Sequence, residues 1–268
     1  MKFEKKKALN CAVHAARLAG ALMRRNWSSV KIINEQSQHD IKLELDVRCQ
    51  KLIERTLLGT FPDSAILGEE GVAGNKDAAF RWVVDPIDGT VNFTYGVPHA
   101  CVSIALQQKL APDKPYVTVL GVVLDPFCDE LWTGVVGGPA RLNGKIIHAS
   151  KRKNLEESIV AIGFSKTEKS LNENLPVFNV LVRRVRKIRM MGAAALSLAY
   201  VASGRFDAYI ESGISLWDIA AAGLILECAG GEFWHQPNGE PGQYRMIANN
   251  GLLRAKLEKV ARNARATP

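Results

Sequence analysis

An apolar run in the chain leads directly into a short segment that holds two acidic residues, a proline and a glycine. Residues 82–84 read Trp-Val-Val, which predicts a buried strand, and Asp85 follows directly before a proline that interrupts regular strand pairing. Asp88 and Gly89 then predict a turn, in which two carboxylates can converge on one hard cation that prefers oxygen ligands. The segment therefore predicts a divalent-metal site at the end of a strand.

The same segment predicts a place for an anion. A helix that begins at Thr90 would leave the N–H groups of Gly89 and Thr90 without helical acceptors, with the positive end of the helix dipole behind them. The alternative is an ordinary Asp-Gly turn on the surface. The apolar strand before the turn favours metal and phosphate chemistry over that alternative.

Three motifs give the chain a family resemblance. Residues 82–93, which read WVVDPIDGTVNF, resemble the signature of the inositol monophosphatase family of magnesium-dependent, lithium-sensitive phosphatases. Residues 66–71 and 215–223 resemble two further motifs of this family, and their order and spacing agree over nearly the whole chain. The resemblance implies an α+β (mixed α/β) fold, a layered αβαβα sandwich of the sugar-phosphatase type, and usually a homodimer.

The resemblance also implies a metal cofactor and a reaction. It implies that two or three Mg²⁺ ions support the hydrolysis of a phosphomonoester by metal-activated water, with the metal ligands Glu69, Asp85, the Ile87 carbonyl, Asp88 and Asp218. The residue types agree, because carboxylates held close together without cations would repel one another. The catalytic residues that it implies, which orient and deprotonate the attacking water, are Asp46, Glu69 and Thr90.

The substrate contacts implied by the resemblance are Asp88, Gly89, Thr90, Gly192, Ala193, Ala194, Glu211 and Asp218. Glu211 takes the place of an acid that accepts hydrogen bonds from inositol hydroxyls, the alternative being an exposed acid at a strand end. Residues 192–194 resemble a Gly-Thr-Ala or Gly-Ser-Ala loop in which Ala193 lacks the hydroxyl. Together with the preceding Met190 and Met191, this change could widen the range of polyol phosphates or reflect helix packing.

Residues 40–46 depart from the family pattern Asp-x-Val-Thr-x-x-Asp, because Leu43 stands at the threonine position. Their alternation with period two predicts a half-buried extended segment that leads into a helix with Asp46 as its N-cap. This structural interpretation is favoured for Asp40 and Glu44 over a catalytic role. The distance of Asp46 from the motif around Glu69 fits the family's catalytic acid, so a catalytic role is still expected for Asp46.

A net charge of +8 is opposite in sign to an acid-lined site. One basic cluster is Lys2, Lys5, Lys6 and Lys7, and the other is Arg183, Arg184, Arg186, Lys187 and Arg189. Each cluster could be solvated surface, a field that steers anionic substrates, or a surface for nucleic acid.

Two functions of different class follow from these features. One is a phosphatase for inositol monophosphate or a related small polyol or sugar phosphate, and the other is a protein that binds RNA or the transcription machinery. The enzyme is favoured, because binding alone does not require the acids. Fructose 1,6-bisphosphate, 3′-phosphoadenosine phosphate and histidinol phosphate, which relatives hydrolyse, remain alternative substrates.

A length of 268 residues and a hydrophobic content of 47% predict one globular catalytic domain over residues 1–268, with two sub-lobes and no evident linker. The first 26 residues predict an amphipathic helix rather than a signal peptide, and no apolar run is long enough to span a membrane. Five cysteines without a Cys-x-x-Cys spacing favour a reducing cytoplasm.

Periodicity predicts helices and antiparallel strands in one mixed architecture. Helices are expected near residues 4–26, 47–58, 171–184, 194–202, 217–228 and 252–264. Strands are expected near residues 102–106, 117–124, 131–135, 159–162 and 207–210. Periodicity alone does not indicate how these elements are layered.

Overall fold

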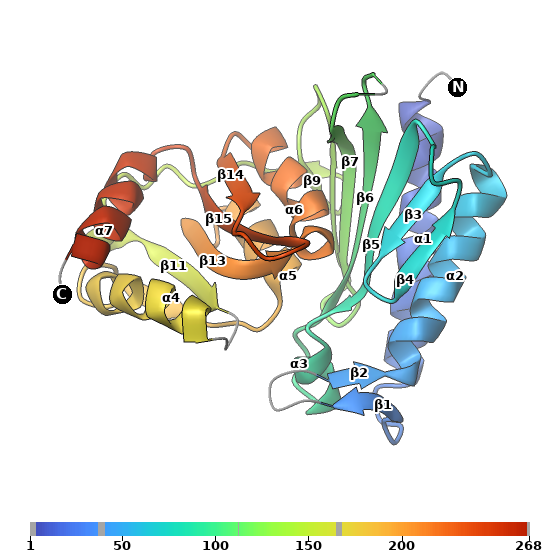
Figure 1. The fold of residues 1–268 in the computed structure, drawn as a ribbon, viewed down its shortest axis with the longest axis horizontal. Coiled ribbons are helices and arrows are strands. Elements are labelled where there is room, and N and C mark those ends of the chain that lie inside the picture. The colour runs from blue at the N-terminus through green and yellow to red at the C-terminus, as the bar shows by residue number, and fades with distance from the viewer. Residues whose placement is uncertain (1–3, 37–40, 112, 165–167, 267–268) are drawn as a thin grey trace.

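The computed structural model describes residues 4–36, 41–111, 113–164 and 168–266. Helices and two large sheets stack in five layers, in the order helix, sheet, helix, sheet, helix (Figure 1). The mixed α/β fold and the layered αβαβα arrangement that the family resemblance implied are therefore confirmed. Within the described ranges, no helix is both long and apolar enough to traverse a lipid bilayer.

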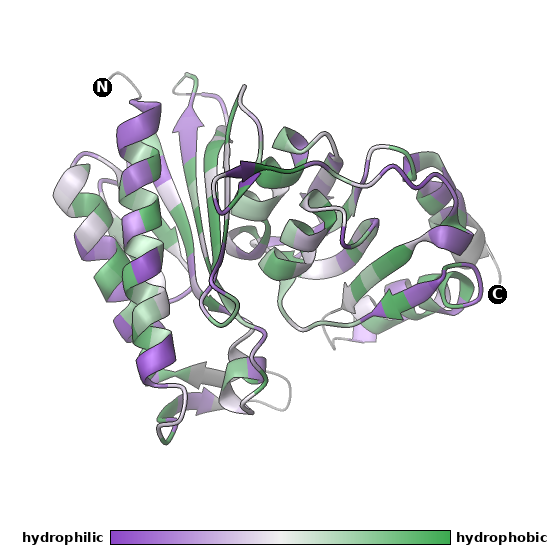
Figure 2. Cartoon of the chain, turned by 180° about the vertical axis from the view of Figure 1, so that it is seen from behind, coloured by the Kyte–Doolittle hydropathy of each residue, from purple (hydrophilic) through white to green (hydrophobic). Residues whose placement is uncertain are grey.

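The first sheet has eight strands in the order β10-β9-β8-β7-β6-β5-β3-β4, and only the pair β3 and β5 is parallel. Helices α1 and α2 cover its outer face with a seam of small side chains, of which Ala8, Ala12 and Ala15 are fully buried. Viewed from behind in Figure 2, α1 carries many hydrophilic residues on the side turned away from this sheet. The elements are α1 (Lys5–Arg25), α2 (Glu44–Thr60), β3 (Ala65–Gly68), β4 (Gly71–Gly74), β5 (Phe80–Asp88), β6 (Cys101–Lys109), β7 (Tyr116–Asp125), β8 (Glu130–Val135), β9 (Arg141–Leu142) and β10 (Lys145–Ile146).

The second sheet has five strands in the order β12-β11-β13-β15-β14, and helices α4 and α7 cover its outer face (Figure 1). Smaller elements complete the described chain, including a two-stranded sheet of β1 and β2 that lies beside α3. The bounds are β11 (Ile159–Phe164), α4 (Glu168–Leu181), β12 (Lys187–Arg189), β13 (Ala208–Ser215), β14 (Glu232–Pro237), β15 (Gln243–Asn249), α7 (Arg254–Ala266), β1 (Ile33–Gln36), β2 (Ile41–Leu43), α3 (Thr90–Thr94) and the 3₁₀ turn η1 (Leu155–Glu157).

Helices α5 (Ala194–Ala202) and α6 (Leu216–Cys228) form the layer between the two sheets. Residues Ile219 to Leu226 of α6 are all buried, because one side of the helix packs on β5 to β8 and the other on β13 to β15. Small residues allow this close approach. A Cβ atom added at Gly121 would lie 2.3 Å from the carbonyl oxygen of Ala221.

The six predicted helices and five predicted strands are confirmed with shifted ends, and one local expectation, the N-cap of α2, is wrong. The interruption of regular pairing that was predicted at Pro86 is confirmed: β5 continues to Asp88, but its register with β6 is irregular between Asp85 and Asp88, since proline lacks the N–H donor. Strand β13 runs directly into α6, with Ser215 as the N-cap of the helix. Asp46 is the third residue of α2, not its N-cap, because the extended Leu43 takes that position.

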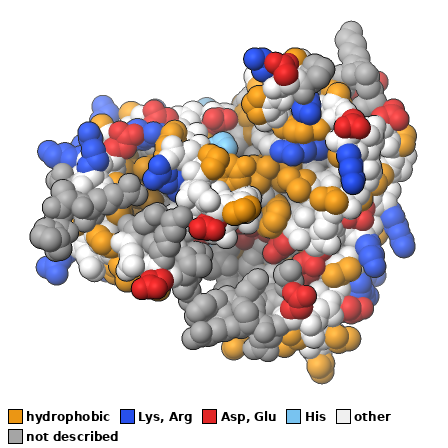
Figure 3. Space-filling model, viewed as in Figure 1, with side chains coloured by type: hydrophobic (Ala, Val, Ile, Leu, Met, Phe, Trp, Pro, Cys, Tyr) orange, Lys and Arg blue, Asp and Glu red, His pale blue; other side chains and the backbone are white. Residues whose placement is uncertain are grey.

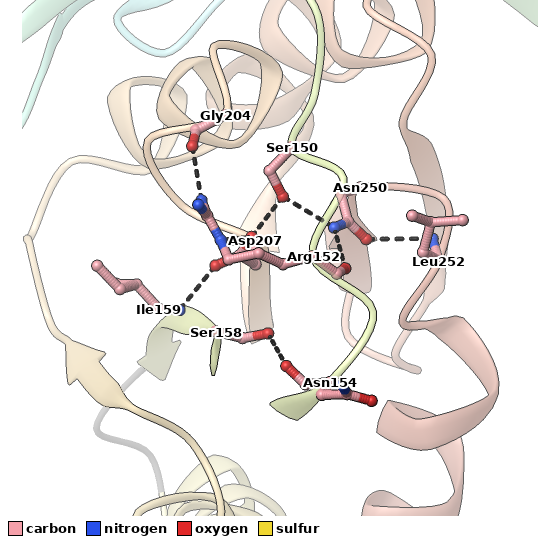
Figure 4. Close-up of polar contacts among 9 residues, drawn as sticks. All are labelled: Ser150, Arg152, Asn154, Ser158, Ile159, Gly204, Asp207, Asn250 and Leu252. Atoms are coloured by element: carbon pink, nitrogen blue, oxygen red, sulfur yellow. Dashed lines mark hydrogen bonds and ion pairs between the residues drawn. The ribbon is translucent and has the colours of Figure 1, made fainter. Parts of the chain in front are cut away.

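A network of hydrogen bonds around the buried Asp207 joins the segment between β10 and β11 to the second sheet (Figure 4). Asp207 is fully buried, and its carboxylate accepts hydrogen bonds from Arg152 Nε at 2.7 Å, from the Ile159 N–H at 2.8 Å and from the Ser150 hydroxyl. The Asn250 side-chain amide donates to Ser150 Oγ at 2.9 Å and to the Arg152 carbonyl at 2.8 Å. The network therefore joins the crossover to the start of β13 and to the residue that follows β15.

We expect Asp207→Ala to lower the free energy of unfolding by about 2–3 kcal/mol, because it leaves several donors without their acceptor. The loss of stability is limited because the Arg152 side chain is 39% exposed and keeps part of its hydration. Urea denaturation of both proteins measures the difference. The control is Asp113→Ala, which removes an exposed ion pair and should cost about 1 kcal/mol or less. Equal losses in the two variants would contradict the role given to Asp207.

Candidate active site

Three carboxylates from two different layers meet at one point. Asp85 and Asp88 lie at the end of β5, and Asp218 lies in the first turn of α6. One oxygen atom from each carboxylate lies within 4.8 Å of the others. The Ser103 hydroxyl of β6 donates to the Trp217 carbonyl at 3.1 Å and so ties the start of α6 to the first sheet. Three of the predicted metal ligands are therefore brought together.

The register of β5 with β6 is irregular at the two acids. Asp85 is paired with Ser103 and Asp88 with Cys101, so β5 carries one extra residue between the two pairs. Gly89 then adopts φ 93°, and a Cβ atom there would lie 2.9 Å from the carbonyl oxygen of His99. Glycine is therefore required where the chain leaves the sheet and enters α3, which begins at Thr90 as predicted.

Asp46 and Asp218 occupy equivalent positions at the starts of two helices. Each is the third helical residue, and each accepts a hydrogen bond from the backbone N–H of its N-cap, at 2.7 Å from Leu43 and 2.8 Å from Ser215. Among the described residues, Asp46 is not part of the 4.8 Å group. Asp40 lies outside the described residues.

The amino end of α5 holds Asp88. The Asp88 carboxylate accepts hydrogen bonds from the backbone N–H groups of Ala194 at 2.9 Å and Ala195 at 2.7 Å, and Cys101 Sγ lies 3.4 Å from it. Asn92 Nδ2 donates to the Met191 carbonyl at 2.8 Å. The loop before α5 is thus held beside the acids by the bond from Asn92 at one end and by the bonds to Asp88 at the other.

Glu69 lies next to the acid group on a segment that a buried glutamine holds. Its N–H donates to the Val84 carbonyl at 3.1 Å, which places Glu69 beside Asp85, although Glu69 is outside the 4.8 Å group of described residues. Gln50 of α2 accepts from the Glu70 N–H at 2.9 Å and donates to the Gly71 carbonyl at 3.2 Å.

Gln50 was not predicted as a site residue. A Cβ atom at Gly68 would lie 2.3 Å from Gln50 Oε1, so the glycine gives the amide room to reach the segment that carries Glu69. The sequence does contain a signal for this contact. Gln50 follows Asp46 by four residues, which places both side chains on one face of α2.

Six of the predicted substrate contacts line one cavity of ≈ 420 Å³, which also includes Met190 and Met191. These six are Asp88, Gly192, Ala193, Ala194, Glu211 and Asp218. Gly89 and Thr90 are not in this lining, and the Thr90 hydroxyl donates to the Ile87 carbonyl at 2.9 Å.

Glu211 faces the cavity from within β13, so the alternative of an acid at a strand end is wrong. The Tyr209 hydroxyl donates a hydrogen bond to its carboxylate. Removal from water raises the pKa of Glu211 to about 7, and the charge of Asp88 acts in the same direction while the Tyr209 hydrogen bond opposes it.

The acid group has raised pKa values throughout. Removal from water, followed by the charges of Glu69, Asp88 and Asp218, raises the pKa of Asp85 well above its ordinary value. The pKa of Asp88 is raised to about 6 by burial, against the lowering effect of the hydrogen bonds from α5. Burial and the neighbouring acids also raise the pKa of Asp218. Clustered carboxylate oxygens with an excess of negative charge fit a hard divalent cation such as Mg²⁺.

Comparison with known proteins agrees with the fold and the acid group. The model of the inositol monophosphatase family matches residues 4–267. The chain is 41% identical over 231 residues to the Nus factor SuhB of Pseudomonas aeruginosa, covering 83% of each chain, and 36% identical over 238 residues to inositol monophosphatase 1 of Solanum lycopersicum, covering 86% of this chain and 85% of that one.

A solved inositol monophosphatase from Anabaena superposes with a TM-score of 0.81 at 32% identity, covering 95% of both chains. Both the sequence and the layered fold are thus shared with this group of phosphatases along nearly their full length. The chain belongs to the inositol monophosphatase family.

Proposed function

We propose that the protein is a magnesium-dependent phosphomonoesterase that hydrolyses inositol monophosphate or a related small polyol or sugar phosphate. The observation that supports this proposal most strongly is the convergence of Asp85, Asp88 and Asp218 within 4.8 Å. Two of these acids also line a cavity of ≈ 420 Å³, which is large enough for a phosphorylated six-membered ring. A binding protein has no physical need for such a group of acids.

The proposed metal ligands are Glu69, Asp85, the Ile87 carbonyl, Asp88 and Asp218, which would hold two or three Mg²⁺ ions. Bound Mg²⁺ lowers the pKa of a water molecule and neutralises charge on the phosphate and on the leaving oxygen. Two backbone N–H groups at the start of α5 donate to the Asp88 carboxylate and so fix its orientation beside Asp85 and Asp218.

The remaining residues would act on the water and the substrate. We assign to Asp46 and Thr90, with help from Glu69, the orientation of the attacking water and the acceptance of its proton. We assign the phosphate oxygens to the N–H groups of Gly89 and Thr90, which begin α3 and have no helical acceptors. Glu211 would accept hydrogen bonds from substrate hydroxyls.

We expect Asp88→Asn to reduce phosphate release from inositol 1-phosphate by at least about 100-fold, because the amide removes one negative ligand from the metal group. The assay is performed with Mg²⁺, and lithium should suppress the activity of the unaltered protein. Asp113→Asn, an exposed acid remote in sequence from the motifs, serves as the matched control. Full activity of Asp88→Asn, or of the unaltered protein after chelation by EDTA, would rule out the metal mechanism.

We expect Gln50→Met to raise the Mg²⁺ concentration needed for half-maximal activity and to lower kcat/KM by about 10- to 100-fold, because the segment that carries Glu69 loses two hydrogen bonds. The matched control is Gln107→Met. Gln107 is also a buried amide, but its partners are Arg81 and Thr118. Identical Mg²⁺ dependence in the two variants would show that Gln50 does not position the acid segment.

The cavity wall, rather than the acid group, would decide between substrates. Ala193 brings no hydroxyl to the loop before α5, so one hydrogen bond to a ring hydroxyl is missing compared with the family pattern. Inositol 1-phosphate, fructose 1,6-bisphosphate, 3′-phosphoadenosine phosphate and histidinol phosphate should therefore be compared by kcat/KM on the same preparation.

A second proposal is a Nus-factor role that involves RNA, since the relative from Pseudomonas aeruginosa carries that name. A basic cluster follows α4 and extends into β12 at the edge of the second sheet, and all of its residues are exposed: Arg183, Arg184, Arg186, Lys187 and Arg189. Lys2, of the other cluster, lies outside the described residues.

We expect a mobility shift with RNA at low salt that weakens as salt rises, because phosphate contacts release counterions. The shift should be lost in the double variant Arg183→Glu, Arg184→Glu and kept in Lys76→Glu, which reverses an exposed charge on another strand connection. Absence of any shift at low salt would remove this second function.

A further inference from the structure

A second cavity lies against the second sheet, on the side covered by α4 and α7. Its volume is ≈ 340 Å³. Strand β13 separates the two cavities: Tyr209 packs with the core around α5 and α6, whereas Ile210 packs with the core beneath α4 and α7. Glu211 is common to both linings. The second cavity is therefore distinct from the candidate active site but adjacent to the strand that serves it.

The floor of this cavity is apolar. Val177 of α4 and Ile210 of β13 are 4% and 8% exposed, and Ile247 of β15 lies on the same face of the sheet. Trp234 of β14, paired with Ile247, adds an indole ring to the wall. A flat apolar group of one or two rings could replace water against these side chains.

The lining of the cavity holds more arginines than acids, since the acids in it are Glu211 and Glu258. Arg245, Arg254 and Arg262 all line it. Arg254 is held in place, since its Nε lies 2.5 Å from Glu258 Oε1 and its guanidinium lies 5.2 Å from the centre of the Trp234 ring. In the face shown in Figure 3, Lys and Arg side chains mixed with acidic ones gather over the end of the molecule where α7 lies.

The other two arginines differ from Arg254 in that no carboxylate holds them in an ion pair within the described ranges. Arg245 faces the Gln236 side chain, whose amide oxygen accepts its hydrogen bond when the amide is oriented to satisfy both groups. Within the described ranges, neither Arg245 nor Arg262 has a carboxylate within ion-pair distance. Guanidinium groups bind oxyanions through two parallel hydrogen bonds, so a pair of them above an apolar floor favours an anion with an apolar body.

We infer that this cavity binds a small organic anion with a flat apolar body. The ring would lie over Val177 and Ile247 beside the Trp234 indole, and its carboxylate, sulfonate or phosphate would meet Arg245 and Arg262 at the rim. The ligand differs in class from the polyol phosphate of the candidate active site, which is lined by acids and small residues.

The test uses 8-anilinonaphthalene-1-sulfonate, a flat aromatic anion that fluoresces in apolar surroundings, with the full chain. We expect one saturable binding event that quenches tryptophan fluorescence, since Trp234 lines the cavity. The double variant Arg245→Gln, Arg262→Gln should weaken binding by at least about tenfold. The control Arg183→Gln, an exposed arginine outside the lining, should bind as the unaltered protein does.

Competition identifies the ligand chemistry. Benzoate should displace the dye, whereas benzyl alcohol, which has the same ring without the charge, should not. Inositol 1-phosphate should leave the dye bound, because it belongs to the other cavity. The inference is overturned if the dye does not bind, if the double variant binds it equally well, or if benzyl alcohol competes as strongly as benzoate.

Discussion

The repulsion among acids that lie close together with little water is the constraint on which the rest of this structure depends. Asp85, Asp88 and Asp218 offer oxygen atoms within 4.8 Å of one another, and their raised pKa values record the unfavourable charge. Backbone N–H groups offset part of it, since Asp88 faces the start of α5 and Asp218 accepts from the N-cap of α6. The positive ends of two helix dipoles therefore point toward the acids.

This requirement explains why a helical layer lies between the sheets. Helices α5 and α6, which lie between the sheets, both bring their N-termini to the acids at the end of β5, and they can do so only if both sheets approach them closely. Gly121 of β7 and Gly223 of α6 make this approach feasible, because a Cβ atom at either position would lie 2.3 Å from a neighbouring atom. The position of the acids therefore depends on the close packing of the helical layer between the two sheets.

Much of the acid group could be predicted because its key residues are local in sequence. The segment around Asp85 and Asp88 carries its own strand, turn and helix start, and the αβαβα layering followed from the family resemblance. The contact of Gln50 with the segment of Glu69 was missed: the spacing from Asp46 indicates only that both side chains share one face of α2, and the contact itself depends on α2 packing beside β3. The hairpin of β14 and β15 was missed, since its half-exposed residues mix polar and apolar types without regular alternation.

The candidate site divides into a part fixed by the backbone and a part free to vary. Asp88 is held by main-chain donors, which no side-chain substitution removes, and the end of β5 is set by its register with β6. The cavity wall, in contrast, consists of side chains such as Met190 and Met191 that project from a loop. Substitutions of Met190 or Met191 can alter which ester fits while the main-chain donors that hold Asp88 stay in place. A fold of this kind can therefore keep one hydrolytic chemistry while its substrates diverge.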